Sequence, residues 1–137
     1  MFFKKEIDKD QDNKLIKIAS LLIHAAKIDE NYSDKERHII ESTLLELGAK
    51  KKKIKALISE AIENEKNSVQ ILDFTKEVKN MNEDEKIKII ETLWRIIYSN
   101  KDADIYETNL MRRLAGLLYV DSKIMGDIKD RIEKENL

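Results

Sequence analysis

The chain has 137 residues, a length typical of one domain that buries roughly two-thirds of its unfolded surface. Hydrophobic residues make up 42% of it and charged residues 39%, which excludes disorder, and no apolar run approaches the roughly 20 residues that span a bilayer. The 26 basic and 27 acidic residues are spread along the chain, so we expect neither nucleic-acid binding nor direct membrane insertion. Without cysteine there are no disulfides or zinc–thiolate sites, and because the N-terminus does not resemble a signal peptide we expect a cytoplasmic location.

Helix-forming residues dominate the sequence, which contains no proline and only three glycines. We therefore predict an all-α fold, a compact bundle of about seven helices formed by residues 11–137 after an N-terminal tail of residues 1–10. Apolar residues at helical spacing place the first helix at about residues 11–28. A second helix is expected to follow Ser33 and to end at Gly48, and a third is expected to carry Ile54 to Ile62.

The second half of the chain is expected to contain four more helices. The fourth is expected to include Val69 to Met81, with Ser68 as its N-cap. The fifth is expected to follow Asn82, which with Glu85 has the spacing of a capping box, and its many isoleucines predict deep burial. Two further apolar patterns predict a sixth helix and then a seventh after Asp121.

An internal repeat is indicated by a shift of 71 residues, which places the first two helices on the fifth and sixth and predicts two pseudo-symmetric halves. Helical periodicity alone could align the apolar positions, so the informative part is the polar connection between the helices. There the oxygen-bearing side chains of two loops coincide. The first set is Asp29, Asn31, Ser33 and Glu36, and the second is Asn100, Asp102, Asp104 and Glu107.

Two interpretations of these loops remain open. Alternating oxygen side chains in a tight turn can converge on a hard divalent cation such as Ca²⁺, Mg²⁺ or Mn²⁺, although neither loop has the glycine and final glutamate of an EF-hand. Alternatively, Ser33 with Glu36 and Asp104 with Glu107 have the spacing of capping boxes, each of which contributes about 1 kcal/mol. Capping leaves four of the eight residues unexplained: Asp29, Asn31, Asn100 and Asp102.

Other features have simpler interpretations. His24 and His38 have no second histidine at ligand spacing and are expected to be packed or at the rim of the core, and Trp94 is expected in the core. Lys50 to Lys53 with Lys55 form a basic run that either is a solvated face or touches phosphate or an acidic partner. No phosphate loop, Ser-His-Asp order or histidine–carboxylate cluster appears, so we do not expect an enzyme.

The two loops resemble the repeated Ala-Asp-Gly-Glu-x-[Asp/Ser]-x-x-Glu signature of the TerB-like tellurite-resistance family. Leu110–Val120, Asp73-Phe74 and Glu91–Trp94 extend the resemblance over about residues 12–135. It implies seven helices in two halves, acidic loops thought to hold divalent cations, and links to tellurite resistance, stress responses and DnaJ-like co-chaperones. The chain departs from the signature where Glu30 and Lys101 replace glycine and where Asn31 and Asn100 replace acids; losing two charges would lower cation affinity.

We therefore expect a non-enzymatic helical binding or scaffold domain whose paired loops bind a divalent cation or a basic protein partner. Two other functions remain open at this point. One is a metal-assisted hydrolase with Glu36 or Glu107 as the base. The other is a co-chaperone-like adaptor that forms homo-oligomers through an exposed apolar patch.

Overall fold

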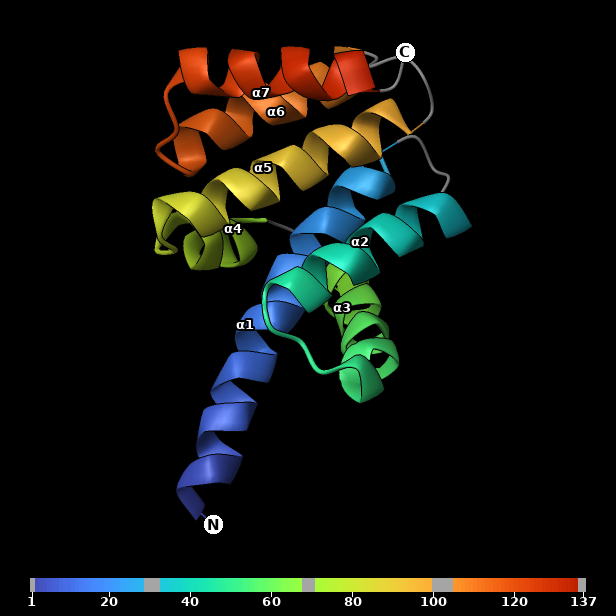
Figure 1. The fold of residues 1–137 in the computed structure, drawn as a ribbon, viewed down its shortest axis with the longest axis vertical. Helices are drawn as coiled ribbons and strands as arrows, with labels where there is room; N and C mark the ends of the chain where they lie inside the picture. The colour runs from blue at the N-terminus through green and yellow to red at the C-terminus, as the bar shows by residue number, and fades with distance from the viewer. Residues whose placement is uncertain (1, 29–32, 68–70, 100–104, 136–137) are drawn as a thin grey trace.

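The computed structural model describes residues 2–28, 33–67, 71–99 and 105–135, and in these residues it contains helices and no strands (Figure 1). The predicted all-α fold is therefore confirmed. The α-helices of the described chain and the short 3₁₀ turn η1 are α1 (Phe2–Ala26), α2 (Asp34–Glu46), η1 (Lys51–Lys53), α3 (Ile54–Asn67), α4 (Leu72–Lys79), α5 (Glu83–Tyr98), α6 (Ile105–Leu117) and α7 (Ser122–Glu135). Among the described residues, no helix has the length and apolar character needed to cross a membrane.

Helices α1 and α5 form the centre of the bundle. Both are apolar around much of their circumference, which is typical of a helix that is covered on several sides. Their fully buried residues include Ile18 and Leu22 on α1 and Ile90 and Leu93 on α5. Helix α1 packs against α3, α4, α5 and α2, while α5 also packs against α2 and α7. Each buried leucine or isoleucine stabilises the fold by about 1.5–3 kcal/mol, so these two helices hold the others in place.

Helix α1 begins at Phe2, whereas the apolar periodicity predicted a start near residue 11. Figure 1 shows its N-terminal half extending away from the bundle. The difference has a simple cause. Residues 2–10 contain neither proline nor glycine, so nothing in the backbone ends the helix where the apolar pattern ends.

Helix α2 ends as predicted, at Gly48, which has a φ of +106°. The Ala49 N–H donates to Leu44 O at 2.9 Å and the Gly48 N–H donates to Leu45 O at 3.1 Å. This pair of bonds is the Schellman motif, which requires a left-handed residue after the helix and therefore favours glycine.

Helix α6 ends in the same way without a glycine. Tyr119 has a φ of 56°, the Val120 N–H donates to Ala115 O at 3.0 Å, and the Tyr119 N–H donates to Gly116 O at 3.4 Å. Tyr119 stands at the position that the 71-residue shift pairs with Gly48. The two helix ends are thus alike at matched positions, while the duplication of the whole chain stays a prediction.

The start of helix α4 differs from the prediction. The helix was expected to include Val69 to Met81 behind Ser68, but it spans Leu72–Lys79 with Ile71 at its N-cap and no side-chain cap. The predicted cap, Ser68, lies outside the described residues. Ile71, at the N-cap, is buried. The other predicted cap is confirmed, because the Glu85 N–H donates to the Asn82 side chain at 2.8 Å.

Candidate functional site

The eight predicted ligand residues divide into two groups. Ser33, Glu36 and Glu107 belong to the described part of the chain. The other five lie outside the described residues: Asp29, Asn31, Asn100, Asp102 and Asp104. The described part of the candidate site is therefore the two helix starts that follow the loops.

The start of α2 is a complete capping box. Ser33 has an extended backbone, with φ −90° and ψ 165°, and its hydroxyl oxygen accepts from the Glu36 N–H at 3.2 Å. In return, Glu36 Oε1 accepts from the Ser33 N–H at 2.9 Å and from the Ser33 hydroxyl at 2.8 Å. Two N–H groups that have no partner inside the helix are satisfied in this way. The capping prediction for this loop is confirmed.

Both glutamates that follow the loops are buried. Glu36 is 1% exposed and Glu107 is 4% exposed, and each is the third residue of its helix. A carboxylate is rarely buried to this degree, because the loss of hydration must be offset by hydrogen bonds or opposite charge. The spacing alone predicted the caps but did not predict that the carboxylates would be buried.

The structure brings the start of α2 into contact with the end of α5. The Lys35 ammonium, in the first turn of α2, donates to the carbonyl oxygen of Ser99 at 3.3 Å. Ser99 immediately follows α5 and precedes the second predicted loop. In Figure 1 the start of α2 and the end of α5 lie side by side. No sequence pattern predicted this contact, which joins residues 64 positions apart.

Among the residues that the structure describes, no three His, Cys, Asp or Glu side chains are grouped closely enough to hold a metal ion. Glu36 and Glu107 supply hard oxygen donors, which suit Ca²⁺, Mg²⁺ or Mn²⁺ better than softer metals. A cation site at these helix starts therefore needs ligands from the two loops in addition to the two buried carboxylates.

A second charged cluster links the end of α1 to α3. Glu65 is bonded through one oxygen to His24 Nδ1 at 3.3 Å and through the other to the Lys27 ammonium at 3.1 Å. Because His24 and Lys27 are three residues apart, in the last turn of α1 and just after it, they face the same side. The prediction of a rim histidine is confirmed for His24, whose side chain is 34% exposed. Its partner could not be predicted, since Glu65 is 41 residues away.

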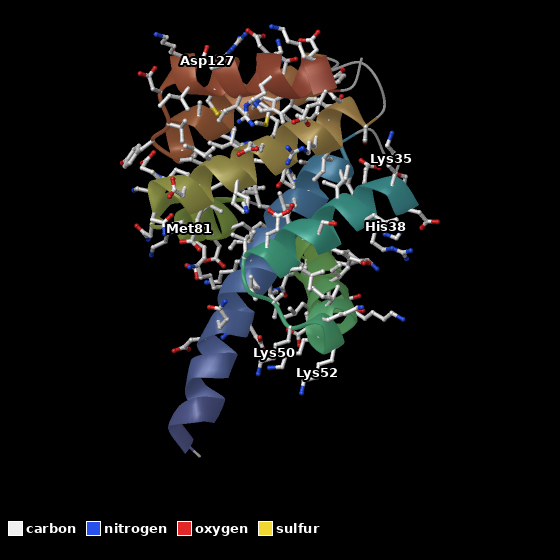
Figure 2. The ribbon with its side chains drawn as sticks, in the orientation of Figure 1. Lys35, His38, Lys50, Lys52, Met81 and Asp127 are labelled. Atoms are coloured by element: carbon white, nitrogen blue, oxygen red, sulfur yellow. The ribbon has the colours of Figure 1, made fainter. Side chains whose placement is uncertain are left out.

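A groove of about 590 Å³ lies between α2 and α5. Lys35 and His38 line it from α2, and Arg95 lines it from α5; Figure 2 shows the two α2 side chains projecting from the first half of that helix. Arg95 is held by carboxylates, because its guanidinium lies 3.6 Å from Glu91 and 3.3 Å from Glu135. The cationic side chain on the α5 side of the groove is thus already paired with carboxylates.

Trp94 confirms the prediction of a core aromatic residue. It is 4% exposed, and its ring stacks on Tyr98 with centroids 6.0 Å apart. Its indole N–H has no hydrogen-bond partner among the described residues. The ring is therefore held by packing and by the Lys129 ammonium, which lies 5.8 Å from its centroid.

The model of the family described as "Tellurite resistance protein TerB" matches residues 15–130. No curated protein and no solved structure matches the chain. The matched segment contains both helix starts described above, all of α2 to α6, and parts of α1 and α7.

Proposed function

The chain belongs to the TerB family of tellurite resistance proteins, and we propose that it is a non-enzymatic helical binding domain whose two polar loops together hold a divalent cation. The residues proposed to bind the ion are the eight oxygen-bearing residues of the two loops. The cation would be Ca²⁺, Mg²⁺ or Mn²⁺, since all the proposed donors are oxygens.

The burial of Glu36 and Glu107 is the observation that supports this proposal. Two carboxylates that are 1% and 4% exposed follow two loops rich in oxygen donors, at positions 71 residues apart. A divalent ion beside them adds opposite charge to the contacts that both carboxylates already make, and so favours their charged form. The Lys35 contact with Ser99 supports a shared site, because it holds the start of α2 close to the chain that leads into the second loop.

Capping and cation binding are compatible at Glu36. The capping box uses Oε1 for both bonds from Ser33. A carboxylate has two oxygens with about four lone-pair sites, so accepting two hydrogen bonds does not exhaust it. The same glutamate can therefore cap the start of α2 and contribute to a cation site.

Thermal unfolding in EDTA and in excess Ca²⁺, Mg²⁺ or Mn²⁺ tests the proposal. A ligand at 100 times its dissociation constant stabilises the folded state by about 2.7 kcal/mol. With an unfolding entropy of about 2.1 cal/mol/K per residue over 137 residues, this raises the midpoint by about 9 °C. Equal midpoints in EDTA and in all three metals would contradict cation binding.

A double variant separates cation binding from capping. Glu36→Gln with Glu107→Gln keeps a side chain that can complete a capping box but removes both charges. We expect the metal-dependent rise in midpoint to disappear. The matched control is Glu60→Gln with Glu63→Gln, which removes two charges from the exposed face of α3 and should leave the rise intact. If the first pair keeps the rise, or the control loses it, the buried glutamates are not ligands.

A basic protein partner is the second proposal for the same loops, supported by their acidic residues. Asp29→Ala with Asp102→Ala should then abolish co-purification of the partner while leaving the unfolding midpoint in EDTA unchanged. Retained co-purification would exclude a role for the two aspartates in binding.

A further inference from the structure

The connection between α2 and α3 carries a concentration of positive charge, much of it exposed. We call it the lysine turn and define it as Lys50, Lys51, Lys52, Lys53 and Lys55. Its central residues form η1, and Figure 2 shows Lys50 and Lys52 projecting away from the bundle at the start of α3. The lysine turn follows the last residue of α2, whereas the proposed cation site lies at the first. A helix of 13 residues separates the two by about 20 Å.

One lysine of the turn lies in an ion pair that joins it to α1. The Lys53 ammonium lies 3.1 Å from Asp12 of α1. Lys51, Lys52 and Lys55 are exposed, and within the described part of the chain they have no carboxylate at ion-pair distance. Three positive charges are therefore held within five positions without an opposite charge to offset them.

The position of these lysines is also unfavourable for the helix that follows. The N-terminus of a helix carries a partial positive charge, which favours acidic residues in the first turn. Helices α2 and α5 follow this rule with Asp34 and Glu36 and with Glu83 to Glu85, respectively. Helix α3 has no acidic residue in its first turn and is preceded by four consecutive lysines. The Lys53–Asp12 ion pair offsets one of these charges, and the exposed lysines remain as a local exception of the kind that is typical of a functional surface.

We propose that the lysine turn is a docking surface for an anionic lipid bilayer. Lysine presents a compact charge on a flexible stem, without the planar fork with which arginine binds a single phosphate in two places. Residues 48–60 contain no arginine and no aromatic residue on which a base could stack. Charges of this kind, projecting from a turn at one end of the molecule, suit a diffuse negative surface. Bound lipid headgroups also supply the negative charge that the start of α3 lacks.

The strength of this contact follows from the number of exposed lysines. Each lysine close to an anionic leaflet raises affinity about fivefold. Three such residues give roughly a hundredfold preference for anionic over neutral bilayers. Salt shortens the screening length to about 3 Å at 1 M, so the preference should vanish there.

Vesicle co-sedimentation of the full chain tests the proposal. The vesicles contain phosphatidylcholine alone or with phosphatidylserine, at low salt and at about 1 M salt. EDTA is present throughout, so the result does not depend on the proposed cation site. We expect sedimentation only with the anionic vesicles at low salt. A protein that stays in solution there, or that binds neutral vesicles equally, overturns the proposal.

Two triple variants with the same change in net charge locate the surface. The first replaces the three exposed lysines of the lysine turn by glutamine, and we expect a roughly hundredfold loss of vesicle affinity. The second replaces exposed lysines on α3 and α7: Lys66→Gln, Lys123→Gln and Lys134→Gln. Equal losses in the two variants would show an effect of net charge alone and overturn the assignment. Binding of the wild type to polyglutamate or duplex DNA without binding to anionic vesicles would also overturn the assignment. Circular dichroism checks that both variants are folded.

Discussion

Replacing Gly48 by alanine should destabilise the protein, because Gly48 ends α2 with a φ of +106°. An L-residue in a left-handed conformation costs roughly 1–2 kcal/mol. The added Cβ would lie 3.3 Å from the side-chain nitrogen of Gln11, whose flexible end can move, so the backbone term dominates. Alanine also restricts the unfolded chain, which offsets part of the cost, and a net loss of about 1 kcal/mol remains.

The midpoint of thermal unfolding measures this loss. At about 2.1 cal/mol/K per residue over 137 residues, 1 kcal/mol corresponds to a decrease of about 3–4 °C. Gly126→Ala is the matched control, because Gly126 lies within α7 and its Cβ would meet no atom within 4 Å. We expect this control to gain about 0.5–1 kcal/mol, since glycine is unfavourable inside a helix. If Gly48→Ala melts at or above the wild-type temperature, the Schellman motif does not hold the end of α2.

Three further changes should alter stability in ways that the same melts measure. The Thr43 and Thr92 hydroxyls lie 2.8 Å apart between α2 and α5, and Thr92 also donates to Lys88 O at 2.8 Å. Thr92→Val should therefore lower the free energy of unfolding by about 1–3 kcal/mol, because it leaves the buried Thr43 hydroxyl without an acceptor. Thr43→Val should lower it by about 1 kcal/mol. A larger loss for Thr43→Val than for Thr92→Val would contradict the direction of donation from Thr43 to Thr92. Trp94→Phe should cost less than the 3–5 kcal/mol of truncation to alanine, because its indole N–H makes no bond to any described residue; a cost in that range would reveal a partner. Replacing the three exposed lysines of the lysine turn by glutamine should raise the midpoint, since it removes repulsion at the start of α3; a lower midpoint would show that they stabilise the fold.

Features that depend on neighbouring residues could be predicted from the sequence. The helical class follows from helix-forming residues with no proline and few glycines. The capping box of Ser33 and Glu36 and the stop at Gly48 were predicted correctly, because each rests on hydrogen bonds that span no more than five residues. The resemblance of the loops to the TerB-like signature was likewise carried by local spacing, and the family match confirmed it.

Contacts between residues far apart in the chain became visible only in the folded structure. The bond from Lys35 to Ser99 and the bonds of Glu65 to His24 and Lys27 join positions 38 to 64 residues apart. No periodic pattern predicts such pairs, because they depend on how whole helices pack. The start of α4 was also predicted three residues too early, because the apolar pattern alone does not show where the helix begins.

The buried glutamates show both sides of this division. Residue spacing was enough to predict that Glu36 and Glu107 lie in the first turn of a helix after a polar loop, and each is the third residue of its helix. The packing of the bundle determined that both side chains are almost fully removed from solvent. Helix position is set by the backbone within one turn, whereas burial is set by the surrounding helices. The proposed cation site rests on this burial, because removing a carboxylate from water is energetically unfavourable.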